Sequence, residues 1–170
     1  WAREHIGKDF DTDGNWAASA QPDSRLLADL LNEPYFQRPP PKSTGTQHFS
    51  SAWLQTRLNS TQGLPAARVQ ATLMALTCQT VADAVQRHAP DTNRILVCGG
   101  GVHNTTLMQR LQQLSGLPVE STATYGIDPD WMEAMAFAWL AQRTLSGKPG
   151  NLPAVTGAVG ARILGAIHPA

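Results

Sequence analysis

The sequence predicts a layered α/β domain. Two short runs with the length of strands, 95–98 and 117–122, are separated by one helical pattern and preceded by others, and such alternation is typical of this class. Ile95 to Cys98 are all apolar, which predicts a strand buried on both faces. A chain of 170 residues is long enough for one domain with a core and short for two.

The first half of the chain is predicted to be largely helical. Helices are expected over residues 1–7, 22–31, 48–58 and 65–90. The first is expected to stop at Gly7, and the polar run "DFDTDGN" after it, 9–15, predicts a turn. The acidic spacing of this run resembles a calcium loop, but Ala20 stands where the last ligand, a glutamate, is required. A solvated turn is therefore preferred.

A stiff loop, "RPPPKSTG" at 38–45, follows the second helix, because its three prolines fix φ and remove hydrogen-bond donors. The loop carries Lys42, Ser43 and Thr44, whose side chains can donate to a sugar or a phosphate. A capped connector leading into the next helix explains the same residues. Both interpretations stay open on the residues alone.

Three consecutive glycines, Gly99 to Gly101, follow the first predicted strand and precede a helix predicted over 105–114. Glycine permits positive φ and the close approach of a flat ligand, and Asn104 is a suitable helix cap. Strand, glycine turn and helix in this order indicate a nucleotide site, although a plain strand-to-helix turn has the same pattern. No Lys-Ser or Lys-Thr pair follows the glycines, which excludes a P-loop.

An NAD-binding oxidoreductase of the Rossmann type is one alternative. Gly99, Gly101 and Asn104 nearly match the dinucleotide fingerprint, and Glu120 follows at about the distance of a ribose-binding acid. Against it, Asn104 occupies the place of the third glycine, and the chain offers neither a hydride-transfer base nor a second β-α-β half.

The helix predicted from Asp128-Pro129 to Gly147 carries one carboxylate, Glu133, within the apolar run "WMEAMAFAWLA". A helix that is apolar all round is expected to be buried, so Glu133 is expected to need a partner. A structural ion pair and a ligand hydroxyl meet this need equally well. An edge strand is expected at 162–167.

Composition limits the classes of partner. The 13 basic and 13 acidic residues balance, so no basic patch for nucleic acid is expected. Without an apolar run of about 20 residues or a leader segment, we expect a soluble cytoplasmic protein with no membrane partner. Cys78 and Cys98 are expected to be reduced core residues, and the five histidines show no metal-ligand spacing.

Taken together, six segments resemble the C-terminal half of anhydro-N-acetylmuramic acid kinase, a bacterial sugar kinase of the actin, sugar-kinase and Hsp70 fold group. They are "DTDGNWAAS" (11–19), "PPPKSTG" (39–45), "VQATLMALT" (69–77), "VCGGGVHNTTLM" (97–108), "GIDPDWMEAMAFAWLAQRTL" (126–145) and "PGNLPAVTGA" (149–158). The resemblance implies that residues 1–170 are the C-terminal lobe of an actin-like (ribonuclease H-like) ATPase fold, a short mixed sheet flanked by helices. The N-terminal lobe is then absent from this chain.

The resemblance also implies site residues. In this fold group the glycine turn lies against the adenosine of ATP. The implied nucleotide contacts are Gly99, Gly100, Gly101 and Asn104. Glu133 matches the acid that helps hold the anhydro-sugar. The other implied substrate contacts, on a matching family loop, are Lys42, Ser43 and Thr44.

For the complete enzyme the resemblance implies a reaction that uses ATP and Mg²⁺ in peptidoglycan recycling. An aspartate deprotonates a water that attacks the anomeric carbon of 1,6-anhydro-N-acetylmuramic acid, while O6 takes the γ-phosphoryl group. The product is N-acetylmuramic acid 6-phosphate.

The family segments Gly-Thr-Ser-x-Asp-Gly, which binds phosphate, and Asp-Thr-Gly-Pro-Gly-Asn, which holds the general base, are expected to lie before Trp1. No catalytic residue is therefore expected in this chain, which alone is expected to be inactive. Ala123 replaces an acid of the family pattern. A homodimer is expected for the complete enzyme, and a non-catalytic lobe that binds nucleotide or sugar is the second alternative.

Overall fold

The structure, a computed structural model, describes residues 1–59, 61 and 63–168. The α-helices are α1 (Ala2–Ile6), α2 (Asn15–Ala18), α3 (Ser24–Leu31), α4 (Pro34–Gln37), α5 (Ser51–Leu58), α6 (Ala66–His88), α7 (Thr105–Ser115), α8 (Met132–Leu145) and α9 (Pro153–Thr156). Short 3-10 helices are η1 (Thr12–Gly14), η2 (Gly100–His103) and η3 (Thr122–Tyr125), and the strands are β1 (Ile95–Val97) and β2 (Val119–Ser121).

The sheet of the described residues is a parallel pair. β1 lies beside β2 with Ile95 opposite Val119 and Val97 opposite Ser121. Because η2 and α7 connect the two strands, they form one β-α-β unit. The predicted α/β class is thus confirmed as many helices with a small sheet, and this sheet is parallel rather than mixed.

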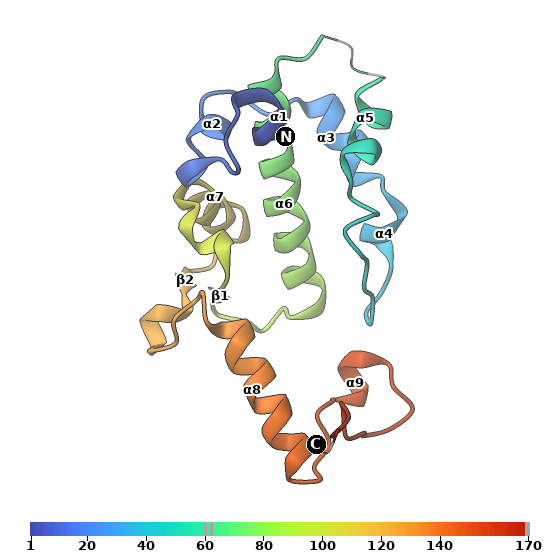
Figure 1. Cartoon of the computed structure of the whole chain (residues 1–170). Helices are drawn as coiled ribbons and strands as arrows, with labels where there is room; N and C mark the ends of the chain where they lie inside the picture. Colours follow the sequence, from blue (N-terminus) through green and yellow to red (C-terminus); the bar gives the residue numbers. More distant parts are fainter. Residues whose placement is uncertain (60, 62, 169–170) are drawn as a thin grey trace.

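Helix α6 is the centre of the molecule. In Figure 1 it runs between α2 and α7 on one side and α3 and α5 on the other. Met74, Cys78 and Ala82, four residues apart, pack with α2 and α7, as a helical stripe should. Val69 and Leu76 pack with α3 and α5 in a second apolar cluster. One long helix therefore serves two cores.

The predicted helix ends are largely confirmed by their caps. Gly7 ends α1 with a φ of 65°, and the Asp23 carboxylate accepts from the backbone N–H groups of Arg25 and Leu26. Ser50 caps α5 by accepting from the N–H of Trp53 at 3.3 Å. These signals lie within a few residues of the bonds they make, so the sequence displays them directly.

The predicted burial of β1 is wrong. Leu96 is 46% exposed and Cys98 is exposed, because α7 covers the sheet on one face and nothing in the described chain covers the other. Cys78, by contrast, is buried as predicted, and its Sγ–H donates to the carbonyl of Leu107 at 3.7 Å. Burial raises the pKa of the Cys78 thiol.

The C-terminal predictions need two further corrections. Helix α8 begins at Met132 rather than Asp128, because the Asp128 carboxylate accepts from the N–H of Asp130 at 2.9 Å and closes a turn. No strand forms over 162–167. Instead, the N–H of Arg162 donates to Asn151 Oδ1 and its carbonyl accepts from Gly150, so a loop uses these groups.

A buried carboxylate joins α4 to α5. Glu33 is 8% exposed; Trp53 Nε1 lies 3.0 Å, and Arg57 Nη2 3.1 Å, from its Oε2. His48 Nε2 lies 3.1 Å from its Oε1. The Trp53 hydrogen bond, against the opposing effect of burial and with help from His48, lowers the pKa of Glu33.

We expect Glu33→Gln to lower the melting temperature at pH 7 by several degrees, because hydrogen bonds to a charged group contribute about 1.5–3 kcal/mol. Because the pKa of Glu33 is lower in the folded than in the unfolded protein, its carboxylate stabilises the folded state at pH values above the unfolded pKa of about 4.3. This stability is lost as the pH falls through the folded-state pKa. The loss of melting temperature in Glu33→Gln should therefore shrink below about pH 4. Melting curves from pH 7 to 2 test this, with the exposed Glu4→Gln as control; a constant deficit would contradict it.

Candidate functional site

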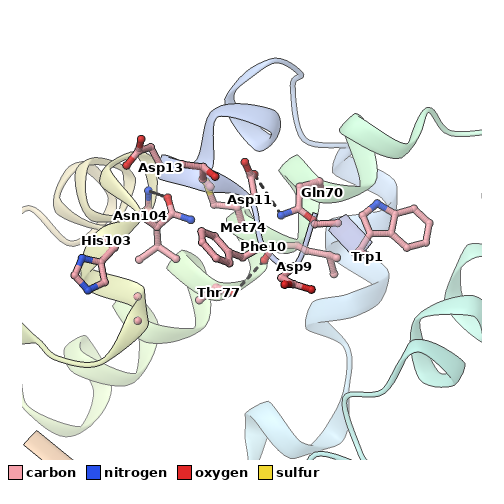
Figure 2. A pocket seen from close by; sticks show the side chains of 16 residues that line it. Trp1, Asp9, Phe10, Asp11, Asp13, Gln70, Met74, Thr77, His103 and Asn104 are labelled. Carbon is pink, nitrogen blue, oxygen red and sulfur yellow. Dashed lines mark hydrogen bonds between the residues drawn. The ribbon is translucent and has the colours of Figure 1, made fainter. Parts of the chain in front are cut away.

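A cavity of about 820 Å³ opens where the N-terminal segment and the glycine turn meet α6 (Figure 2). Its volume lies within the range of about 300–1,000 Å³ typical of small-molecule sites. It is lined by Trp1, Ala2 and Asp9 to Asp13 from the N-terminal segment, Gln70, Leu73, Met74 and Thr77 from α6, and Gly100, Gly101, His103, Asn104 and Leu107 from the glycine side.

The glycine turn forms one wall with its backbone exposed. Gly99 has φ 71° and ψ −172°, a conformation open essentially to glycine alone, and its N–H donates to the carbonyl of Pro129 at 2.8 Å. Gly100 and Gly101 line the cavity, and a Cβ added at either would meet nothing within 4 Å. The chain's own packing therefore does not require these two glycines, whereas a ligand lying on the backbone would.

Asn104 joins the glycine wall to α7. Its Oδ1 accepts from the N–H of Leu107 at 2.9 Å, so it caps the helix as predicted. This bond assigns the other end of the amide as a donor. Figure 2 shows that end turned toward the cavity beside Met74, where it is available to a ligand.

The opposite wall is acidic. The Asp11 carboxylate accepts from the N–H groups of Trp16 and Ala17, both at 2.8 Å, and so anchors the start of α2. Asp9 pairs with Arg3 at 2.8 Å, while the Asp13 carboxylate has no ion pair within the described ranges. This wall would repel bare phosphate and suits an uncharged, donor-bearing group such as adenosine. The sequence predicts only a turn for residues 9–15. The resemblance of residues 11–19 to a family segment is the signal in the sequence that could have indicated a cavity wall here.

The two walls meet at Gly14. It is buried with a φ of 72°, and an added Cβ would lie 2.3 Å from Asn104 Oδ1, 2.7 Å from Met74 Cε and 2.8 Å from Thr106 Cβ. Only glycine permits this close approach between the acidic turn and α7.

His103 is a cavity residue that we did not predict from the sequence. Its Nε2 lies 2.9 Å from both carboxylate oxygens of Asp130. Both side chains are exposed, so the pair contributes little to stability. No spacing in the sequence relates two residues that meet only after the turn has folded.

The predicted substrate residues lie elsewhere. Glu133 is exposed on α8, so its predicted burial is wrong, and it forms no ion pair within the described residues. Lys42 Nζ donates to the carbonyls of Tyr35 and Phe36 at 3.1 and 3.2 Å, which makes it a cap for α4. Ser43 and Thr44 are exposed on the loop. None of these side chains lines the cavity.

Within the described part of the chain, no group of three His, Cys, Asp or Glu side chains is arranged to hold a metal ion. None of the described helices has both the length and the apolar character needed to cross a membrane.

Residues 1–170 match the family model described as anhydro-N-acetylmuramic acid kinase. The chain belongs to this family. It is 55% identical over 171 residues to an anhydro-N-acetylmuramic acid kinase of Xanthomonas campestris pv. campestris strain 8004, covering 100% of this chain and 45% of that protein. The same name is given to a Xylella fastidiosa protein at 54% identity, with the same coverage, and to a Pseudomonas fluorescens protein at 49%, covering 99% of this chain and 47% of that protein.

This chain thus spans slightly less than half the length of the kinases it matches. Membership of a kinase family removes the NAD-binding oxidoreductase alternative. The structure agrees, because Glu120 accepts from the hydroxyl of Tyr125 at 2.8 Å and is not among the residues that line the cavity.

Replacing Gly14 with Ala should destabilise the protein more than replacing Gly7 with Ala. Both glycines have positive φ, but a Cβ at Gly7 meets nothing within 4 Å. Gly7→Ala should cost roughly 1–2 kcal/mol from backbone strain, and Gly14→Ala about 1–3 kcal/mol more from overpacking. Urea unfolding measures the free energy of unfolding of both variants. Equal decreases would show that the close packing around Gly14 does not add to the cost of the substitution.

Proposed function

We propose that this chain is the C-terminal lobe of a two-lobe kinase with an actin-like fold. The complete protein converts 1,6-anhydro-N-acetylmuramic acid, water and ATP to N-acetylmuramic acid 6-phosphate and ADP during peptidoglycan recycling in the cytoplasm. The observation that carries the proposal is the cavity beside the glycine turn in a chain that matches the kinase family throughout.

The adenosine of ATP is proposed to lie in this cavity. The open backbone at Gly100 and Gly101 supports contact with a flat base or ribose, and the free end of the Asn104 amide supports one hydrogen bond. Gly99 contributes by holding the turn in shape. The carboxylates of Asp11 and Asp13 on the acidic side of the cavity support a triphosphate that points away from them, toward the other lobe.

The anhydro-sugar is proposed to contact Glu133, with Lys42, Ser43 and Thr44 as further candidates. Support for Glu133 is its lack of an ion pair in the described residues together with its place near the start of α8, where a carboxylate is favoured by the helix dipole. Support for Lys42 is weaker, because two backbone carbonyls already accept from its ammonium group.

In the proposed reaction a water attacks the anomeric carbon, the C1–O6 bond breaks, and O6 takes the γ-phosphoryl group. The general base, an aspartate, and the phosphate clamp belong to the other lobe. Mg²⁺ is proposed as the partner of the nucleotide phosphates, since it keeps few protein ligands. The described residues of this chain do not by themselves form a site for it. The complete enzyme is proposed to be a homodimer.

The proposal is tested by producing this chain together with the unmatched part of the Xanthomonas campestris relative and measuring ATP-dependent phosphorylation of the anhydro-sugar. Product from the pair, and none from either polypeptide alone, is expected. A pair that assembles but makes no product would contradict the proposed function.

In such a complex, Gly100→Val should raise the KM for ATP roughly tenfold or more, equivalent to at least about 1.4 kcal/mol. The branched side chain would enter the space that the base needs. Because a Cβ at Gly100 meets nothing within 4 Å, the melting temperature should not change. An unchanged KM in a folded variant would remove the glycine turn from the nucleotide site.

Glu133→Gln should lower sugar turnover roughly tenfold or more, the loss of one charge-assisted hydrogen bond of about 1.5–3 kcal/mol. The melting temperature should stay constant, because the glutamine amide is nearly isosteric with the carboxylate and can still hydrogen-bond. The KM for ATP should also stay constant, because Glu133 does not line the cavity beside the glycine turn. Sugar kinetics and melting curves on one variant check both statements. A destabilised protein with normal sugar kinetics would make Glu133 a structural residue.

A further inference from the structure

Helix α8 is the largest apolar element without cover in the described structure. None of its residues is buried. Met135, Phe137 and Trp139 are 51%, 64% and 53% exposed, although transfer of such side chains out of water is strongly favourable. Figure 1 shows α8 extending away from α6 and from the sheet.

The exposed side chains surround the helix rather than forming one stripe. Residues two apart on an α-helix project about 160° apart, so Phe137 and Trp139 lie on nearly opposite sides. A helix that is apolar all round is an internal helix. What covers α8 must therefore enclose it from more than one side.

The sheet beside α8 lacks cover as well. Leu96 of β1 is 46% exposed on the face that α7 does not reach. Parallel sheets are normally covered on both faces, and two strands alone are marginally stable. Both the exposed face of the sheet and helix α8 thus need further polypeptide packed against them.

We propose that α8 is an internal helix of the complete kinase, enclosed by the part of the full-length chain that lies outside these 170 residues. This inference rests on the proposed function, in which the chain is one lobe. The kinase of Xanthomonas campestris is 55% identical over 171 residues that make up 45% of its length, so more than half of such a protein is available to enclose α8. A second copy of this chain fits less well, because a two-fold interface applies one patch to itself and covers one side of a helix.

The test uses the two separately produced polypeptides, this chain and the unmatched part of the Xanthomonas campestris kinase. Light scattering should give a complex that holds equal numbers of the two polypeptides, and hydrogen exchange of the α8 amides should slow on assembly. Phe137→Asp and Trp139→Asp, on opposite sides of α8, should each weaken association at least tenfold. Leu114→Asp, at a leucine of α7 that is 46% exposed, should change it less than twofold and serves as the matched control.

Three results would overturn the inference: no complex, a complex of unchanged affinity with both α8 variants, or a homodimer of this chain that either variant dissolves. Circular dichroism checks that the variants fold. If Phe137→Asp does not fold, Phe137→Ala replaces it. A complex that depends on α8 but makes no phosphorylated sugar would leave this inference standing and contradict the proposed function alone.

Discussion

The packing of α6 on two opposite sides is the constraint on which the rest of the structure depends. Met74, Cys78 and Ala82 hold α2 and α7 on one side, and Val69 and Leu76 hold α3 and α5 on the other. A helix of 23 residues gains most of its stability from such contacts rather than from its own hydrogen bonds. The N-terminal segment and the β-α-β unit share no sheet, so α6 sets their relative position. The cavity is the space that remains where both meet this helix.

Gly14 converts that arrangement into a fixed site. Because Asn104 caps α7, lines the cavity and abuts Gly14, the glycine wall and the acidic wall cannot move independently. The Asp11 carboxylate accepts from backbone N–H groups of α2 and so holds the acidic turn in place. Its charge therefore stabilises the fold of this wall. The site is therefore shaped before a ligand arrives, which reduces the entropic cost of binding. In the proposed function, adenosine would lie in this cavity, and the phosphates would be directed away from the carboxylates.

The sequence predicted the features that local bonds determine. Asn104 and Gly7 act within one helical turn of their own positions, and both serve as the predicted cap and stop. Ser50 caps α5 at a position that the sequence predicts to lie inside the helix. Burial was predicted poorly, because no described segment packs over Leu96 or Glu133. An apolar pattern indicates which side chains would gain from burial and does not show which segment covers them. Among the residues that the structure describes, the strand expected at 162–167 has no neighbouring strand to bond with. The acidic wall of the cavity and the His103–Asp130 pair arise from contacts between distant segments, which no spacing in one sequence reveals.

The most direct test of the nucleotide assignment is hydrogen exchange, by mass spectrometry, of the assembled two-polypeptide protein with and without a non-hydrolysable ATP analogue. The assignment predicts slower exchange of the backbone amides in 99–104 and in the turn at 11–17, with little change in the loop at 38–45. NADH at the same concentration should have no effect. Slower exchange confined to other segments, or protection of 99–104 by NADH and not by the ATP analogue, would contradict the assignment of this cavity to the adenosine of ATP.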